Sequence, residues 1–507
     1  MKRLLAITAL SLLLVLFVYP SAFIYSKDTL PDRNDTRLIA YIIGQVQQNI
    51  TDGQPLYYGT FFAPDNNTLT YSDPFITSAV MTLPFRALTT NPIQIFNIVF
   101  IIGFFLTVFS SFLLFDYLFK DPWITLLSVL LFNLSGFHLA YYPHIQMLLL
   151  WPLILSIYFF SRYLKENRSD YLFLFFAGVT LQMAESLFPA YLIFFSTVIL
   201  YIVTRLTQNK FINDLKFIFI EGIAFYIAWA FLLYPYLELH FSLPEASRPI
   251  RDAAAFSLGI DQIFTMYHSW TVILLFLISA VWQILNPLRT TSYFQKAFTI
   301  TFFFSLIMSL GPVLKIFGKN IRIFSLPIPL PYTLFYYLFP GFTGFRTPSR
   351  FIVLALLAAV ILIGFWLKPL FEKLKTKTKL TLILIVFSSL LLEADFPLKA
   401  YPVNINMHPV YEQVRALPPD AIILELPIKL WTSPDHEIES IRSLYSLSHG
   451  HRRYNGFSGF ATNRWIELTQ KIEADGLTQE SINALYSLGV THVVENNSLR
   501  PLIDPNN

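Results

Sequence analysis

Residues 92–119 read PIQIFNIVFIIGFFLTVFSSFLLFDYLF, an almost uninterrupted apolar run with one acidic residue, Asp116. A helix needs about 20 such residues to cross the hydrocarbon core of a bilayer. Comparable runs recur along the chain between short polar breaks. We place about 11 spans, near residues 4–25, 92–119, 123–141, 145–163, 171–187, 189–204, 217–239, 269–285, 297–316, 351–367 and 380–392. The pattern predicts a polytopic α-helical membrane protein.

The composition of the whole chain agrees with this prediction. Of its 507 residues, 55% are hydrophobic and 13% are charged, and the mean hydropathy is +0.54. Soluble domains carry about 25% charged residues, so an ordinary soluble protein is excluded, as is a disordered chain. The 36 basic and 32 acidic residues are too evenly balanced to indicate nucleic-acid binding. The absence of cysteine excludes disulfides, thiolate metal sites and cysteine nucleophiles.

The positions of the basic residues predict the orientation in the membrane. With the N-terminus in the cytoplasm, every connection on the cytoplasmic side is short and basic, as the positive-inside rule requires. These connections hold Lys120; Arg162, Lys165 and Arg168; Arg205, Lys210 and Lys216; Arg289 and Lys296; and Lys368, Lys373, Lys375, Lys377 and Lys379. The outer side receives three long loops, 26–91, 240–268 and 317–350, and the C-terminal residues. We therefore expect a multi-pass protein of a prokaryotic plasma membrane with an extracytoplasmic C-terminus.

The two ends of the chain need separate interpretation. The first span is interpreted as an uncleaved signal anchor, although Pro20-Ser21-Ala22 also fits a signal-peptide cleavage site. Residues 1–394 are assigned to the transmembrane domain and 395–507 to a small extracytoplasmic α/β domain. In the latter, 421–426 and 490–495 have strand patterns, while 463–475 and 479–487 have helical spacing.

Two carboxylates in the first outer loop are candidates for chemistry. Asp35 precedes an amphipathic stretch, and at the membrane surface it can act as a general base or bind a divalent cation. Its alternative role is to cap the helix that follows. Asp73 stands before Pro74, where an aspartate is also common in a simple turn. No glycine-rich nucleotide loop, zinc-protease motif or serine-hydrolase motif accompanies them.

The remaining candidates lie at the ends of predicted spans. Arg346 and Arg350 precede a span, and guanidinium groups bind phosphate by paired hydrogen bonds, although arginines at span ends also simply reach the lipid headgroups. Glu185 lies within or at the edge of a span, where a carboxylate is costly unless it has a function or reaches water. His138 and His144 flank a short outer turn, where they can bind substrate or cap two helix ends.

The chain resembles the GT-C superfamily of integral-membrane glycosyltransferases in its organisation: an N-terminal span, a long first outer loop with an early aspartate, many spans and an outer C-terminal domain. Locally it is similar to a branch of bacterial and archaeal membrane proteins described as GT-C-like from their topology. The similarity lies in residues 71–74 (YSDP), 83–85 (LPF), Asn97, 137–144 (FHLAYYPH), 344–351 (GFRTPSRF), 425–427 (ELP) and 488–492 (LGVTH).

The resemblance implies transfer of a sugar from a polyprenyl-phosphate donor to a glycan, lipid or protein acceptor on the outer face. It implies that Asp35 is the catalytic acidic residue, with Asp73 as a second one. Because the loop lacks a compact Asp-x-Asp or Glu-x-Asp pair, a divalent cation such as Mg²⁺ or Mn²⁺ stays an open option, and no nucleotide cofactor is expected. The alternatives are a transporter or flippase for a lipid-linked intermediate, and a non-catalytic assembly protein.

Overall fold

The computed structural model describes residues 2–208, 211–265, 267, 269–287, 292–393 and 397–502. Four positions used in the sequence predictions lie outside these residues: Lys210, His268, Arg289 and the domain boundary at 394/395. The chain forms two compact units. Unit 1 comprises Met1–Tyr19, Ile102–Leu232 and Ser247–Leu398, and unit 2 comprises Pro20–Ile101, Leu233–Ala246 and Lys399–Asn507.

A helix is present at every predicted span, which confirms the helical membrane character of the chain. These helices are α1 (Lys2–Val18), α5 (Pro92–Phe119), α6 (Pro122–Asn133), α8 (Trp151–Glu166), α9 (Ser169–Glu185), α10 (Leu187–Gln208), α11 (Phe211–Ser242), α14 (Trp270–Leu285), α15 (Tyr293–Ser309), α17 (Ile352–Lys373) and α18 (Thr376–Glu393). Six helical stretches within the described residues are long and apolar enough to cross a membrane. The number of about 11 spans stays a prediction.

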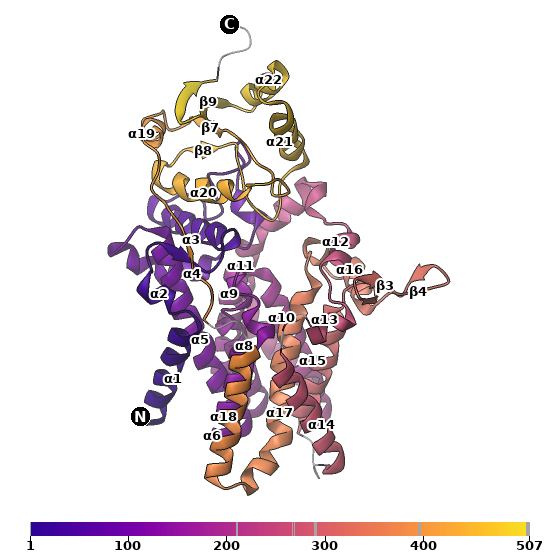
Figure 1. Ribbon diagram of the computed structural model, residues 1–507. Coiled ribbons are helices and arrows are strands. Elements are labelled where there is room, and N and C mark those ends of the chain that lie inside the picture. The colour runs from indigo at the N-terminus through magenta and orange to yellow at the C-terminus, as the bar shows by residue number, and fades with distance from the viewer. Residues whose placement is uncertain are drawn as a thin grey trace. The chain divides into compact units, whose positions relative to one another are not determined.

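Unit 1 is built around α17, which packs against α6, α14 and α15 (Figure 1). Its residues from Ile352 to Gly364 are buried on all sides, which requires that the helix be apolar around its whole circumference. α11 (Phe211–Ser242) is also apolar, but only 11% of its most hydrophobic window is buried. Such an unburied apolar surface suits contact with lipid chains rather than with water.

Short polar turns separate the helices of unit 1. The Asp121 side chain caps α6 by accepting hydrogen bonds from the backbone N–H groups of Trp123 and Ile124, both at 2.9 Å. Asn167 takes a left-handed conformation (φ 52°) at the end of α8 and lets the chain turn back into α9. Each turn therefore satisfies the free backbone groups at a helix end, which an apolar surrounding would otherwise leave unpaired.

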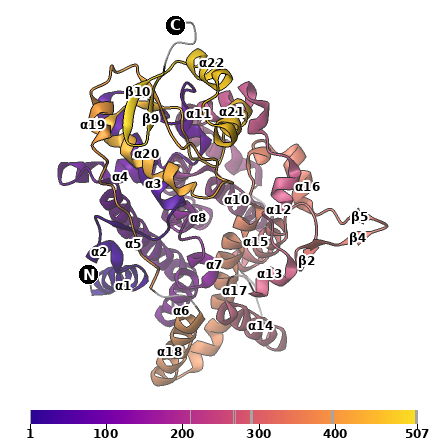
Figure 2. The same ribbon diagram turned by 45° about the horizontal axis from the view of Figure 1, so that its top comes forward.

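Between α15 and α17, unit 1 carries two hairpins and a short helix. They are β2 (Lys315–Ile316) with β3 (Lys319–Asn320), β4 (Arg322–Ile323) with β5 (Leu326–Pro327), and α16 (Pro331–Leu338). The β4–β5 hairpin projects to the side of the helices rather than along them, as both views show (Figures 1 and 2).

Unit 2 contains a four-stranded sheet in the order β10-β9-β7-β8. Its strands are β7 (Ile422–Glu425), β8 (Arg452–Arg453), β9 (Val490–Glu495) and β10 (Ser498–Pro501), with β7 parallel to β8 and β9, and β10 antiparallel to β9. Helices α19 (Val410–Arg415), α20 (Glu437–His449), α21 (Asn463–Asp475) and α22 (Gln479–Ser487) accompany the sheet. The two strands and two helices predicted for the C-terminal part are confirmed.

Residues 26–91, which the sequence predicts to be an outer loop, belong to the same unit as the C-terminal sheet. The backbone N–H of Arg453 donates to the carbonyl of Thr60 at 2.7 Å, and that of Phe62 donates to Asn455 at 3.1 Å, so the loop runs beside β8. β1 (Thr29–Leu30) also pairs with β6 (Tyr401–Pro402). α3 (Asp35–Asp52) packs against α20 and against α4 (Ile76–Thr82). The two segments therefore share one core.

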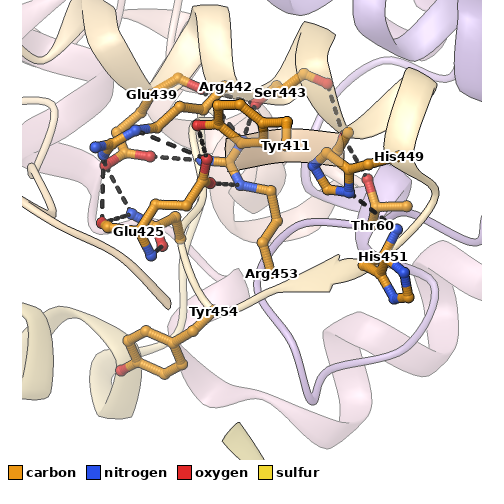
Figure 3. Close-up of polar contacts among 12 residues, drawn as sticks. Thr60, Tyr411, Glu425, Glu439, Arg442, Ser443, His449, His451, Arg453 and Tyr454 are labelled. Carbon is orange, nitrogen blue, oxygen red and sulfur yellow. Dashed lines mark hydrogen bonds and ion pairs between the residues drawn. The ribbon is translucent and has the colours of Figure 1, made fainter. Parts of the chain in front are cut away.

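A buried network of four charged side chains lies inside unit 2 (Figure 3). Arg453 Nε is 2.7 Å from Glu425 Oε2, and its Nη2 is 2.6 Å from Glu439 Oε2. Arg442 Nη1 is 3.0 Å from Glu439 Oε1. Both carboxylates and Arg453 are fully inaccessible to solvent. Burial alone would raise the pKa of Glu425, but Arg453 and Arg442 outweigh this effect and hold that pKa below its usual value. The two positive and two negative charges balance.

Candidate functional site

Three of the predicted substrate-binding residues come together in unit 1. Arg346 lies between the short turns Phe342–Gly344 and Pro348–Phe351, and Arg350 lies in the second, which leads into α17. Both positive charges act on His144, which precedes the turn Ile145–Met147. Burial, followed by Arg350 and Arg346, lowers the pKa of His144 to about 3, so its imidazole is neutral at physiological pH.

The two arginines differ in their surroundings. Arg346 is exposed, and its guanidinium carbon lies 4.7 Å from the centre of the Phe256 ring. Arg350 is half-buried, with its guanidinium carbon 5.9 Å from the centre of the Phe188 ring. Within the described part of the chain, the Arg350 guanidinium forms no ion pair or hydrogen bond, and its Nε is buried. A half-buried cation of this kind favours an anionic ligand with several acceptor oxygens.

The turn that carries His144 is held firmly to the rest of unit 1. Tyr141 donates a hydrogen bond from its hydroxyl to the carbonyl of Ser349 at 3.2 Å, next to Arg350. Phe137 donates its backbone N–H to Ser269 Oγ at 2.9 Å. These contacts come from three separate parts of the sequence. They hold His144 and Arg350 in the same region of unit 1.

His138 differs from His144 in being fully buried. Its Nε2 lies 2.8 Å from the carbonyl oxygen of Leu148, and its ring stacks on Phe132 with the ring centres 4.8 Å apart. This packing favours a structural role, in which His138 joins the two sides of the turn. Its assignment to substrate binding stays a prediction.

Glu185 is the last residue of α9, and Ser186 separates it from α10. Its side chain is 3% exposed, and a negative charge at a helix C-terminus faces the negative end of the helix dipole. Phe188, three residues later, is the ring against which Arg350 lies. The break between α9 and α10 therefore brings the neighbourhood of Glu185 to the Arg350 side of unit 1.

Gln182 was missed by the sequence analysis. It lies almost one turn before Glu185 in α9 and is fully buried, yet neither atom of its side-chain amide has a hydrogen-bond partner among the described residues. A buried unpaired amide is unfavourable and indicates a group that a ligand or water satisfies. The signal in the sequence was its place in Gln182-Met183-Ala184-Glu185, where two polar residues share an apolar run.

Asp35, in unit 2, is the first residue of α3 and is half-exposed. The carboxylate that caps this helix belongs to Asp32, whose Oδ2 accepts hydrogen bonds from the backbone N–H groups of Asn34 and Asp35, both at 2.8 Å. Asp32 therefore supplies a cap at this helix start.

Asp73, also in unit 2, lies in the loop between the turn Thr68–Tyr71 and α4, and it is half-exposed. The loop is anchored by Tyr236, whose hydroxyl donates to the carbonyl of Ser72 at 3.0 Å. Phe75 follows with a φ of 49°, an uncommon conformation for an aromatic residue. Asp73 thus occupies a defined loop that precedes α4.

The structure places the seven predicted site residues in two sets. Unit 1 holds Glu185, His138, His144, Arg346 and Arg350, and unit 2 holds Asp35 and Asp73. Among the residues described, no group of three or more histidine, aspartate and glutamate side chains is arranged to hold a metal ion. Neither a protein-family model nor a curated protein matches this sequence.

Proposed function

We propose that this protein is a membrane glycosyltransferase that moves a sugar from a polyprenyl phosphate to an acceptor hydroxyl on the outer face of a prokaryotic plasma membrane. The observation that carries the proposal is the half-buried guanidinium of Arg350, which forms no ion pair or hydrogen bond among the described residues. It lies in the same region of unit 1 as Arg346 and a neutral His144. Such a group suits a phosphate that remains at the membrane surface.

In the proposed reaction the acceptor oxygen attacks the anomeric carbon, and the bond between that carbon and the phosphate oxygen breaks. The phosphate leaves as polyprenyl phosphate, and direct displacement inverts the configuration at the anomeric carbon. Arg346 and Arg350 stabilise the negative charge that grows on the leaving phosphate. His144 is assigned to the substrate as a neutral group, and Glu185 is assigned to the sugar hydroxyls.

The role of general base, which takes the proton of the acceptor hydroxyl, is assigned to Asp35 on the resemblance to GT-C enzymes. The partial exposure of Asp35 at the start of α3 supports this assignment. Asp73 positions the acceptor. With Asp35 it also offers oxygen ligands of the kind that Mg²⁺ or Mn²⁺ prefers, and no step of the proposed reaction depends on such an ion.

The test of Asp35 compares the native protein with Asp35→Asn in membranes given labelled polyprenyl-phosphate sugars and an envelope extract as the acceptor mixture. General bases contribute about 10²- to 10⁴-fold, so we expect a loss of that order at equal protein abundance. Asp52→Asn is the matched control, because Asp52 is an exposed aspartate at the other end of α3. Equal turnover of Asp35→Asn and Asp52→Asn would refute the role of Asp35.

The test of Arg350 measures the binding of polyprenyl phosphate. A hydrogen bond to a charged group contributes about 1.5–3 kcal/mol, so Arg350→Gln should weaken binding about 10- to 100-fold. The matched control is Arg251→Gln, since the Arg251 side chain is 85% exposed. Binding by the native protein without turnover of any donor would contradict the transferase and favour the transporter or non-catalytic alternatives.

A further inference from the structure

The segment between α15 and α17 begins and ends at the same end of the helices of unit 1. α15 ends at Ser309, and α17 starts at Ile352. Both helices occupy predicted spans, so residues 312–338 start within a few residues of a membrane surface. We call residues 312–338 the interfacial segment. Its β4–β5 hairpin projects sideways from the helices, in the direction in which a membrane surface would extend (Figure 2).

The interfacial segment exposes large apolar side chains where a water-facing loop would carry polar ones. Phe324, at the hairpin tip, is 95% exposed, and the neighbouring apolar side chains are more than half exposed. The set comprises Phe317, Ile323, Phe324, Leu326, Leu334, Tyr337 and Leu338. An exposed apolar patch of this kind marks an interaction surface.

The backbone of the hairpin tip points to the same conclusion. Phe324 and Ser325 have φ values of 50° and 69°, a left-handed pair that tight hairpins usually build from asparagine and glycine. A bulky aromatic residue is unfavourable in this conformation. Phe324 adopts this strained backbone conformation although its ring packs against almost nothing in the protein. We take this as a sign that the ring contacts another molecule or surface.

The charged residues of the interfacial segment itself are all basic. Residues 312–350 contain no aspartate or glutamate, and Lys319 in β3 and Arg322 in β4 are exposed. One carboxylate lies against the segment, where Asp261 Oδ1 accepts a hydrogen bond from the backbone N–H of Phe317 at 2.7 Å. Lys315, in contrast, is buried, and its ammonium group donates to the carbonyls of Ala254 and Ser257, each at 2.7 Å. Apolar side chains flanked by exposed basic ones are typical of segments that insert into the surface of a bilayer with anionic lipids.

We propose that the interfacial segment inserts the tip of the β4–β5 hairpin into the lipid at that surface. Phe324 enters the boundary between headgroups and acyl chains, and Lys319 and Arg322 contact anionic lipid phosphates. The hairpin then fixes the depth and tilt of the segment that leads through α16 to Arg346 and Arg350. The inference does not depend on the proposed transferase activity.

The absence of cysteine from the chain allows a direct test, because a single introduced cysteine takes a nitroxide label without removal of native ones. We would label Phe324→Cys in lipid nanodiscs and measure the accessibility of the nitroxide to oxygen and to a water-soluble nickel complex. Ile227→Cys in the unburied part of α11 is the lipid control, and Glu480→Cys in α22 is the water control.

We expect the label at 324 to be at least fivefold less accessible to the nickel complex than the label at 480, and to approach the label at 227 in its accessibility to oxygen. In the background Lys319→Gln and Arg322→Gln, this protection should fall in phosphatidylglycerol nanodiscs and change little in phosphatidylcholine. Equal nickel accessibility at 324 and 480 would overturn the proposal.

Discussion

Replacing Arg453 by methionine should destabilise the core of unit 2 and raise the equilibrium constant for its local opening. Methionine keeps most of the length of the arginine stem but removes the two ion pairs to Glu425 and Glu439, at 2.7 and 2.6 Å. Arg442 then faces two buried carboxylates alone. Removing one partner of a buried pair costs about 3–5 kcal/mol, because the remaining charge has no access to water. That cost corresponds to about a 10²- to 5 × 10³-fold larger opening constant.

Hydrogen–deuterium exchange of the full chain in nanodiscs measures this opening constant locally. Peptides from β7 and α20 should exchange faster in Arg453→Met, while peptides from α17 in unit 1 should not change. Arg453→Lys keeps the charge but loses the fork of donors, so its effect should lie between those of the native protein and Arg453→Met.

The matched control is Arg500→Met, which removes a 3.0 Å pair to Glu495 in which both side chains are about 40% exposed. Such a pair contributes about 0–1 kcal/mol. The effect of Arg453→Met should also shrink between pH 8 and pH 5, since a buried carboxylate without its partner takes up a proton. An effect of Arg453→Met no larger than that of Arg500→Met would refute the reasoning.

Three further predictions concern single residues. Burial lowers the pKa of His449 to about 4, so below pH ~6.5 the folded state binds fewer protons than the unfolded state. The free energy of unfolding of unit 2 should therefore fall by up to about 3 kcal/mol between pH ~6.5 and ~4. In denaturation curves, His449→Gln should show a weaker dependence on pH. A Cβ at Gly456 would overlap the Phe62 ring, so Gly456→Ala should destabilise unit 2 by about 1–3 kcal/mol, and a protease-protection assay that finds no change would contradict the close packing. Asp121→Ala removes the cap of α6 and should lower the free energy of unfolding by about 1 kcal/mol, measured by thermal denaturation. Asp121→Asn keeps a capping oxygen and should stay close to the native value.

The positions of the helices could be predicted from the sequence because hydrophobic runs and caps are local signals. The C-terminal helices 463–475 and 479–487 have the predicted bounds, since Thr462 and Thr478 cap them. The pairing of Thr60 with Arg453 could not be predicted, because the two residues are almost 400 positions apart and neither has a local pattern that names its partner. For the same reason the sequence assigned Glu425 to a strand and to the ELP motif but did not predict its ion pairs with Arg453 and Arg442.

The candidate site was predictable to a smaller extent. Arg346, Arg350 and His144 were each selected from their chemistry at a span end, and the structure brings them into one region of unit 1. His138 has the same chemistry, but only the structure distinguishes a fully buried ring from a half-buried one. Asp32 was overlooked as the cap of α3 because Asp35 stands closer to the amphipathic run.

The shared core of unit 2 gives the C-terminal residues a role in positioning α3. Gln48 Nε2 donates to the carbonyl of Leu447 in α20 at 2.7 Å, and Arg37 Nη1 is 3.7 Å from Glu437 Oε2. α20 is in turn fixed by the network of Glu439 and Arg453. The proposed general base must be held within a fraction of an ångström of its productive position, so we expect the network to act on Asp35 through α20 and α3. Loosening the network should therefore lower the proposed transfer rate even though Asp35 itself is unchanged, whereas Arg500→Met should leave that rate unaltered.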